Sequence, residues 1–218
     1  MEYFIYLDLI GTLIFAITGA FRAVKHELDI LGVLVLATFT GVGGGILRDI
    51  ILGKTPPAVF QNELHLIICI IGGLVVFFAA PKIAENWPVI KIGDAIGLGV
   101  FAVLGAWKGA ESGLGPIGTV LIGTISAVGG GVIRDLLVME IPAVIRTDFY
   151  ATAAAMGSLC YYICYKLHVS LPVSLISGLS LTTGTRILAM IFKLNLPKVN
   201  RLPQEPSEIS KNKHKHII

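Results

Sequence analysis

The sequence predicts an all-α membrane protein with seven transmembrane helices, arranged as two inverted three-helix repeats followed by a seventh helix. Two observations lead to this fold class. First, 55% of the 218 residues are hydrophobic and only 14% are charged, whereas a soluble domain carries about 25% charged residues. Second, one pattern of glycine, aspartate and arginine occurs twice at a constant spacing. A chain of this length has room for about seven crossings of roughly 20 residues each and no further catalytic domain.

Apolar runs bounded by charged residues, proline or glycine predict the individual spans. The seven spans fall at approximately 3–22, 28–52, 64–80, 91–108, 115–138, 149–166 and 171–193. The N-terminus has Glu2 where a signal peptide has positive charge, so we expect the first helix to remain in the protein. Residues 1–193 form the predicted transmembrane domain. Residues 194–218 are polar and rich in proline and lysine, which predicts a disordered cytoplasmic tail.

Basic residues between the spans predict the orientation in the membrane. The side of the C-terminus carries more of them than the other side, which has only Lys54, Lys108 and Lys166. By the positive-inside rule we expect an inner (cell) membrane protein with its N-terminus outside and its C-terminus in the cytoplasm. The one dense basic run is in the tail and has no interleaved aromatic residues, which excludes nucleic acid as a partner. The richer side carries Arg22, Lys25, Lys82, Lys91, Arg146 and the tail lysines.

An internal repeat relates two parts of the chain, about 3–80 and about 91–166, at a constant offset of 86 residues. The matches are mostly Gly, Asp, Arg, Pro and Phe, which apolar sequence does not match by chance. Each repeat holds three spans, so the second copy starts on the opposite side of the membrane. We therefore expect repeats inverted about an axis in the membrane plane. Matched pairs include Asp8 with Asp94, Gly11 with Gly97, Phe15 with Phe101, Arg48 with Arg134, Asp49 with Asp135 and Pro56 with Pro142.

Three consecutive glycines interrupt the second span, and the same triplet interrupts the fifth. Glycine is a poor helix former, and bare backbone at membrane depth is tolerated only where protein or water covers it. We expect both helices to break at the triplets and line an ion pathway; the alternative is close packing of small residues. The triplets are Gly43, Gly44 and Gly45, and Gly129, Gly130 and Gly131.

A charged pair follows each triplet by about one helical turn. The pairs are Arg48-Asp49 and Arg134-Asp135. Charges inside a membrane face a cavity or one another, and adjacent residues on a helix do not face each other. Inverted symmetry therefore predicts that Arg48 meets Asp135 and that Arg134 meets Asp49. Two roles remain open, namely a gate on an ion path or an ion-pair clasp between the halves.

Asp8 and Asp94 also occupy matching positions, each near the start of an apolar helix. A carboxylate there would draw cations toward a pore mouth, and the alternative is ordinary solvation of a helix end. The sequence shows no catalytic triad, metal motif, phosphate loop or dinucleotide fingerprint. We therefore expect neither an enzyme nor a bound cofactor or metal.

Two three-helix units, each with Gly-Gly-Gly, Arg-Asp and Pro, together with a seventh helix, resemble the prokaryotic branch of the trimeric intracellular cation channels. The resemblance covers residues 3–193. It implies a homotrimer in which every protomer has a water-filled path, kinked at the glycines, that conducts potassium, sodium and other monovalent cations. Animal relatives bind phosphoinositide through a Lys-Glu-Val motif, which this sequence lacks. Prokaryotic relatives are also described as glycine transporters.

The function we predict is passive conduction of monovalent cations. Carbonyl groups freed at the glycine breaks would replace part of an ion's hydration shell, and Asp49 and Asp135 would offset the charge of Arg48 and Arg134. The arginines would gate the path through movable ion pairs. The alternative is a secondary transporter of glycine or a similar small zwitterion, in which helix N-termini after the breaks hold the carboxylate.

Overall fold

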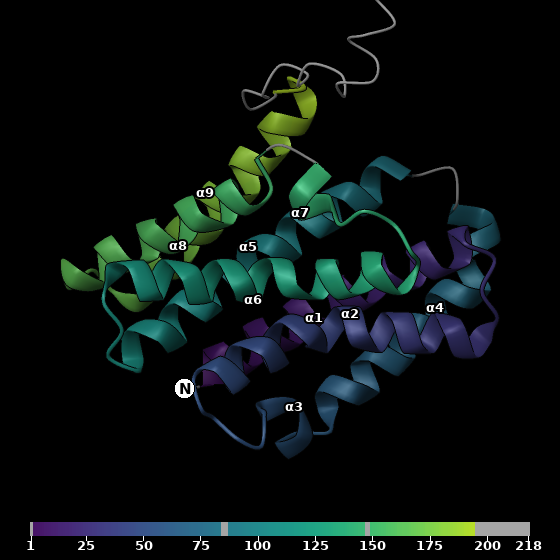
Figure 1. Cartoon of the computed structure of the whole chain (residues 1–218), viewed down its shortest axis with the longest axis horizontal. Coiled ribbons are helices and arrows are strands. Elements are labelled where there is room, and N and C mark those ends of the chain that lie inside the picture. Colours follow the sequence, from purple (N-terminus) through teal and green to yellow (C-terminus); the bar gives the residue numbers. More distant parts are fainter. Residues whose placement is uncertain (1, 84–86, 147–148, 195–218) are drawn as a thin grey trace, which may run out of the picture.

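The computed structural model describes residues 2–83, 87–146 and 149–194, and every regular element in these ranges is an α-helix (Figure 1). The longer helices lie close to the seven predicted spans. Two short helices, α3 (Ala58–Gln61) and α7 (Ala143–Arg146), were not predicted. The predicted tail lies outside the described residues from residue 195 onward. The longer helices are α1 (Glu2–Lys25), α2 (Ile30–Ile51), α4 (Leu64–Ile83), α5 (Trp87–Glu111), α6 (Pro116–Leu137), α8 (Ala151–Lys166) and α9 (Leu171–Ile191).

Five of these helices, α1, α2, α5, α6 and α9, are long and apolar enough to cross a membrane. The apolar part of α4 is the shorter segment Leu64–Ala79, and α8 has 16 residues. At 1.5 Å per residue, a helix of that length covers about 24 Å of the roughly 30 Å hydrocarbon layer. The chain is thus an all-helical membrane protein, and seven crossings remain a prediction.

The local sequence explains how α2 and α6 begin and end. The Asp29 side chain caps α2 by accepting a hydrogen bond from the Gly32 amide at 2.7 Å. Pro116 opens α6 in the first turn, where an amide hydrogen has no partner within the helix. Arg48 and Arg134 lie in the last turns of α2 and α6. Their positive charges are favourable at the negative ends of these helices.

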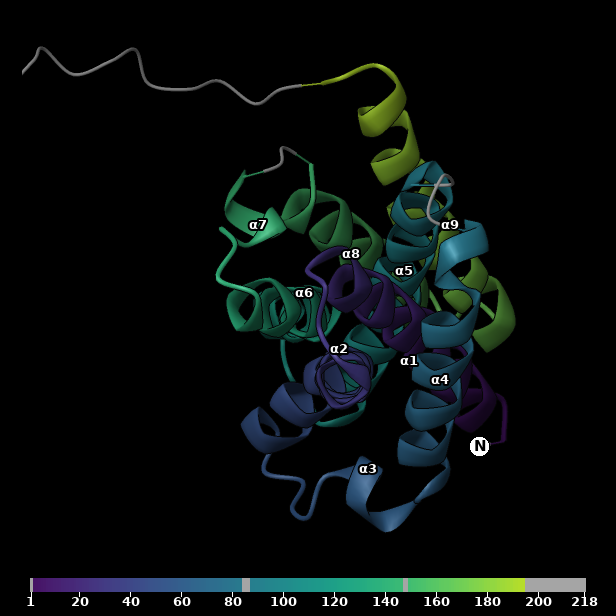
Figure 2. The ribbon, with the colours of Figure 1, turned by 90° about the vertical axis from the view of Figure 1, so that its right-hand side faces the viewer.

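The helices pack around the contact between α2 and α6, which lie side by side (Figure 2). Helix α1 packs on α2 and α4, while α5 packs on α6, α8 and α9. Between α1 and α5, the buried rings of Phe15 and Phe101 stack with centroids 5.1 Å apart. These two residues are a matched pair of the repeat, so the two copies meet through equivalent side chains.

Glycine makes the close contact between α2 and α6 possible. A Cβ atom at Gly44 would collide with the carbonyl oxygen of Ser126, and one at Gly130 would collide with that of Thr40. The two contacts are equivalent in the repeat, because Gly44 and Gly130 are 86 positions apart and so are Thr40 and Ser126. Because Gly44 meets Ser126 while Thr40 meets Gly130, the two helices run antiparallel.

The predicted break of these two helices at the glycine triplets is wrong. Both α2 and α6 are helical over their full lengths, and the triplets lie inside them. Each glycine costs about 1 kcal/mol of helix stability relative to alanine, but the close interhelical packing that it permits offsets this loss. The carbonyl groups of the triplets stay within the helices, so no break frees them for an ion. Close packing, the alternative interpretation, describes Gly43, Gly44, Gly129 and Gly130.

We predict that Gly44→Ala lowers the thermal unfolding temperature in detergent, because the added methyl group must displace the backbone of α6. Overpacking of this kind costs about 1–3 kcal/mol. Gly184→Ala on α9 is the matched control, since a Cβ there meets no atom within 4 Å. The control should leave the unfolding temperature unchanged or slightly raised by better helix propensity. Equal unfolding temperatures for Gly44→Ala and the unmodified protein would contradict the packing role.

Candidate functional site

Two buried clusters of charged side chains lie at the C-terminal ends of α2 and α6. The arginine of each Arg-Asp pair is at most 5% exposed, and the aspartate at most 2%. The first cluster consists of Asp8 from α1, Arg48 and Asp49 from α2, His65 from α4 and Lys108 from α5. The second cluster consists of Arg22 from α1, Asp94 from α5, Arg134 and Asp135 from α6, and Glu140 from the following turn.

In the first cluster, Asp49 receives two cationic donors. Arg48 Nε and Lys108 Nζ both donate to Asp49 Oδ1, each at 2.9 Å. Arg48 Nη2 lies 3.8 Å from Asp8 Oδ2, and His65 Nε2 lies 3.6 Å from the same oxygen. Arg48 Nη1 is buried without a hydrogen-bond partner among the described residues. The two carboxylates are therefore balanced by the guanidinium and ammonium groups.

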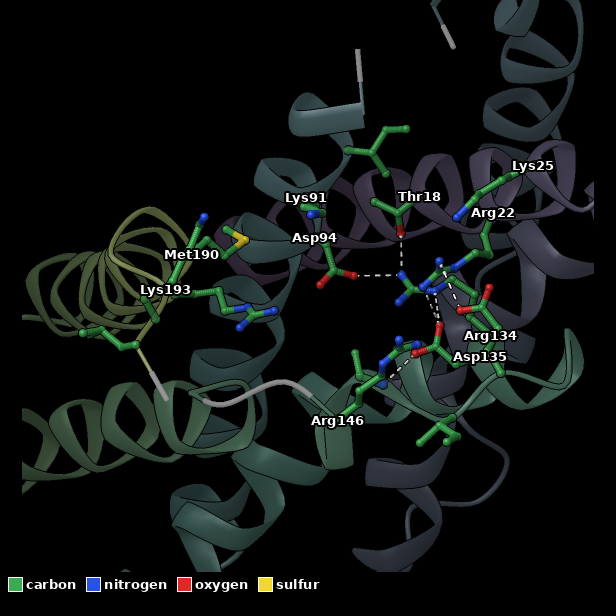
Figure 3. Close-up of a pocket in the computed structure, with 17 residues that line it drawn as sticks. Thr18, Arg22, Lys25, Lys91, Asp94, Arg134, Asp135, Arg146, Met190 and Lys193 are labelled. Carbon is green, nitrogen blue, oxygen red and sulfur yellow. Dashed lines mark hydrogen bonds and ion pairs between the residues drawn. The ribbon is translucent and has the colours of Figure 1, made fainter. Parts of the chain in front are cut away.

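The second cluster repeats this arrangement with matched residues. Arg134 Nε donates to Asp135 Oδ1 at 2.9 Å, and Arg134 Nη1 donates to Asp94 Oδ1 at 2.8 Å. Arg22 Nη2 donates to Asp135 Oδ1 at 3.4 Å. Figure 3 shows the Arg134 guanidinium held between Asp94 and Asp135.

Both aspartates also hold the chain that follows their helix. Asp49 Oδ2 accepts a hydrogen bond from the Ala58 amide at 3.1 Å, at the first residue of α3. Asp135 Oδ2 accepts one from the Ala143 amide at 2.8 Å, at the first residue of α7. Each short helix is thus tied to its charged cluster.

The predicted pairing of Arg48 with Asp135, and of Arg134 with Asp49, is wrong. Each arginine instead contacts its own neighbour in sequence and the aspartate of its own repeat. The reason is geometric, because α2 and α6 cross antiparallel at the glycines and their C-terminal ends point in opposite directions. A long guanidinium side chain can also curl back to the adjacent carboxylate, although the two residues leave the helix in different directions.

Sequence reasoning missed Arg22 and Lys108 as site residues and used them only to assign orientation. Lys108 of the second repeat pairs with Asp49 of the first, and Arg22 of the first repeat pairs with Asp135 of the second. These two residues are themselves 86 positions apart, so the repeat offset was the signal that identifies them. They provide the ionic contacts between the repeats that were expected from the Arg-Asp pairs.

The two clusters differ in how open they are. The second opens on a cavity of about 670 Å³, which we call the vestibule, and the first on a cavity of only about 10 Å³. A single water molecule needs about 10–15 Å³, so the first cluster is nearly sealed. Three acidic side chains line the vestibule, namely Asp94, Asp135 and Glu140. Its basic lining residues are Arg22, Lys25, Lys91, Arg134, Arg146, Arg186 and Lys193.

The third glycine of each triplet lies beside its cluster and not in the helix contact. Gly45 lines the small cavity, and a Cβ there would approach Arg48 Nη2 at 3.5 Å. A Cβ at Gly131 would lie 2.9 Å from the Tyr150 hydroxyl and 3.7 Å from Arg134 Nη2. The triplets therefore serve two purposes, helix contact and space for the arginine.

Glu140, which lines the vestibule, contacts a residue outside the helices. His26, just after α1, contacts Glu140 with Nε2 and Oε1 2.8 Å apart. Arg22 Nη1 lies 3.3 Å from Glu140 Oε2. Burial opposes ionisation of Glu140, but the hydrogen bond to His26 and the nearby charges of Arg22 and Lys25 outweigh it and lower the pKa of Glu140 below its ordinary value of 4.5.

Known proteins are similar to this chain both in sequence and in fold. A family model described as glycine transporter matches residues 5–81 and 91–166. The chain belongs to this family. Solved TRIC channels, among them a prokaryotic one, are similar to it in sequence and in fold. The first residues of the two matched stretches, 5 and 91, lie 86 positions apart, which is the offset of the internal repeat.

Two relatives and two solved structures illustrate the similarity. A UPF0126 membrane protein of Deinococcus radiodurans is 44% identical over 70% of this chain and 72% of its own length. The inner membrane protein YadS of Escherichia coli is 36% identical over 88% of this chain and 94% of its own. A TRIC cation channel structure matches at 40% identity and a TM-score of 0.84, covering 91% of this chain and 98% of that one. The TRIC orthologue from Rhodobacter sphaeroides matches at 32% identity and a TM-score of 0.85. This match covers 89% of this chain and 100% of that one.

We predict that Arg48→Met destabilises this TRIC family member more than Arg134→Met does. Each substitution leaves buried carboxylates without their guanidinium partner, and loss of one partner of a buried pair costs about 3–5 kcal/mol. In the second cluster, water from the vestibule can reach the carboxylates that lose their partner and reduce that cost, whereas the first cluster is nearly sealed. Thermal unfolding in detergent measures the difference.

The double variant Arg48→Met with Asp8→Asn serves as the control for charge. It should recover part of the lost stability, because the neutral amide no longer needs a cation. If Arg134→Met proved the more harmful single substitution, the assignment of the first cluster as the sealed one would be incorrect.

We predict that the contribution of Glu140 to stability disappears in acid. Because its pKa is lower in the folded than in the unfolded protein, Glu140 stabilises the fold above about pH 4.5, and this stabilisation is lost as the pH falls through the lowered pKa. The unfolding temperatures of the unmodified protein and of Glu140→Gln should differ at pH 7 and converge once the pH has fallen below the lowered pKa of Glu140. A difference that persists undiminished in acid would rule out the charge of Glu140 as its cause.

Proposed function

We propose that this protein is a passive channel for monovalent cations, potassium and also sodium, with one path in each protomer. The observation that carries the proposal is the pair of buried charged clusters at the two ends of a single helix crossing. Charges at membrane depth are costly and mark ion or substrate pathways by default. The same fold, at 40% identity and a TM-score of 0.84, occurs in a TRIC cation channel.

The path that we propose runs from the vestibule past Arg134 and Asp135, along the α2–α6 crossing, to the first cluster. Asp49 and Asp135 offset the charge of the arginines, and Asp8 and Asp94 hold the guanidinium groups near the two mouths. The first cluster forms the gate, because its cavity of about 10 Å³ is too small for a hydrated ion. Opening requires the ion pair between Lys108 and Asp49 to separate.

The organisation that we propose is two inverted three-helix repeats followed by α9 as the seventh crossing helix. The antiparallel contact of α2 with α6 and the stacking of Phe15 on Phe101 support it, because both join equivalent positions of the repeats. For the orientation, the excess of basic side chains around the vestibule supports a cytoplasmic location of that face. By this assignment the N-terminus is outside and the C-terminus is in the cytoplasm of a cell whose inner membrane holds the protein.

The oligomer that we propose is a homotrimer. Its support is the Rhodobacter sphaeroides relative, a trimeric intracellular cation channel orthologue that matches over 100% of its length. Many large apolar side chains on the outer surface of the protomer are exposed, among them Phe39, Phe78 and Ile117. Such a surface suits contact with lipid and with neighbouring protomers.

The alternative function is secondary transport of glycine or a similar small zwitterion. The description of the matching family favours it, and the vestibule offers arginines for a carboxylate and Asp94 for an ammonium group. One open and one sealed cluster also suit a carrier that exposes its site alternately. The two functions differ in turnover, because a carrier moves a substrate only once per conformational cycle.

Single-channel recording of the purified protein in a planar bilayer tests the choice. In symmetrical KCl we expect discrete unitary currents, and in a concentration gradient of KCl a reversal potential that reports permeability to cations over chloride. The mass of the same sample in mild detergent should correspond to a trimer. Saturable glycine uptake into vesicles without unitary currents would instead identify a transporter.

A further inference from the structure

The nearly sealed first cluster contains a histidine, His65, that has no counterpart in the repeat. Its side chain is 8% exposed and lies at the start of α4. The position 86 residues further along the chain is Ala151, which cannot ionise. Histidine is the side chain whose ordinary pKa, about 6.5, lies in the physiological range. The first cluster therefore holds a group that can change its charge near neutral pH.

The hydrogen bond of His65 Nδ1 decides where the neutral ring carries its hydrogen. Nδ1 lies 3.1 Å from the backbone carbonyl oxygen of Asn62. A carbonyl oxygen only accepts, so Nδ1 must carry the hydrogen of this bond. Since a neutral imidazole ring has a single N–H group, its Nε2 then holds a lone pair. The neutral ring thus has no hydrogen to donate from Nε2.

This second nitrogen faces the carboxylate of Asp8. His65 Nε2 lies 3.6 Å from Asp8 Oδ2, which is longer than a hydrogen bond. Nε2 is buried and has no hydrogen-bond partner among the described residues. A lone pair opposite an ionised carboxylate is unfavourable, whereas a proton on Nε2 converts the same contact into a charge-assisted hydrogen bond. Protonation therefore creates a bond between α4 and α1 that the neutral ring cannot make.

The charged surroundings of His65 come from several helices. Helix α4 packs on α1, α2 and α3, and α3 carries no ionisable side chain. Glu63, two positions before His65, is exposed. A proton on His65 adds one positive charge to the side chains that hold the gate closed. The other ionisable members of the first cluster are Asp8 of α1, Arg48 and Asp49 of α2, and Lys108 of α5.

We propose that protonation of His65 by solvent holds the first cluster closed, so that acid reduces cation conduction. This inference rests on the proposed function, in which the first cluster is the gate. Two effects act in the same direction. The bond from Nε2 to Asp8 Oδ2 ties α4 to α1 in the sealed arrangement, and the added positive charge opposes entry of a cation into a narrow space with low-dielectric walls.

The first test measures open probability in a planar bilayer at about pH 8 and about pH 5.5, on either side of the ordinary pKa of histidine. A hydrogen bond to a charged group shifts an equilibrium by about ten-fold or more, so open probability in the unmodified protein should fall by at least about this factor in acid. His65→Asn and His65→Gln cannot take up a proton in this range and should show no such decrease. A decrease that persists in these variants would overturn the role of His65.

His26→Asn is the matched control variant. His26 also places its Nε2 against a carboxylate, 2.8 Å from Glu140 Oε1, but it does so beside the second cluster. This substitution removes a titrating histidine and leaves the first cluster as it is, so the decrease in acid should remain. Loss of the decrease in His26→Asn as well as in His65→Asn would contradict a sensor that is specific to the first cluster.

Nuclear magnetic resonance provides a second measurement that does not depend on conduction. In protein whose histidines carry the heavy nitrogen isotope, the nitrogen chemical shifts distinguish the two neutral forms of the ring from the protonated form. Signals that are missing from His65→Asn or His65→Gln identify those of His65. We expect hydrogen on Nδ1 alone at about pH 8 and on both nitrogens at about pH 5.5.

The two measurements separate failure of this inference from failure of the proposed function. Hydrogen on Nε2 alone at the higher pH, or a ring that stays neutral at the lower pH, overturns the inference. Unitary currents that do not depend on pH overturn it as well and leave the channel intact. Absence of unitary currents at both pH values overturns the proposed function, and the gating role of His65 with it, whatever the nitrogen signals show.

Discussion

The structure depends on one helix crossing that has no room for a Cβ atom. Where α2 meets α6, the backbone carbonyl oxygens of Thr40 and Ser126 occupy the space that side chains of Gly130 and Gly44 would need. Two antiparallel helices in contact near their middle have their C-terminal ends at opposite faces of the molecule. The crossing therefore decides where the two Arg-Asp pairs lie, and it separates them.

Burial of so many charges is possible because each pair of aspartates is balanced by one cation of its own repeat and one cation of the other repeat. Arg48 and Arg134 each contact two carboxylates of their own repeat. The remaining cation comes from the other repeat, as Lys108 or Arg22, and forms the ionic contact between the halves. Ion pairs of this kind can separate and re-form as units, which is the property that a gate on an ion path requires. A clasp needs the same pairs to stay closed, so the two roles differ in whether the pairs move and not in which residues form them.

The core has matched halves, but the two halves of the complete chain differ in the cavities beside their charged clusters. One cluster is nearly sealed while the other faces a vestibule of about 670 Å³. Helix α9 contributes Arg186, Ala189 and Met190 to the lining of the vestibule, whereas the residues that line the small cavity come from other parts of the chain. A symmetric scaffold with an added helix outside the repeat gives the two ends of the proposed path different surroundings.

Sequence by itself determined the helical segments, the membrane environment, the repeat and the Arg-Asp pairs as the charged centres. These features depend on local hydropathy and on residue spacing, both of which are visible along the chain. Only the tertiary structure decided what the glycines do and which carboxylate each arginine contacts. The glycine triplets suggest helix breaks when helix propensity is considered alone, and only the neighbouring helix shows that packing offsets the lost propensity. Likewise, the partner of Arg48 depends on the direction in which α2 leaves the crossing. The position of Arg186 at the vestibule depends on where α9, a helix outside the repeat, packs, and no spacing along the chain encodes that position.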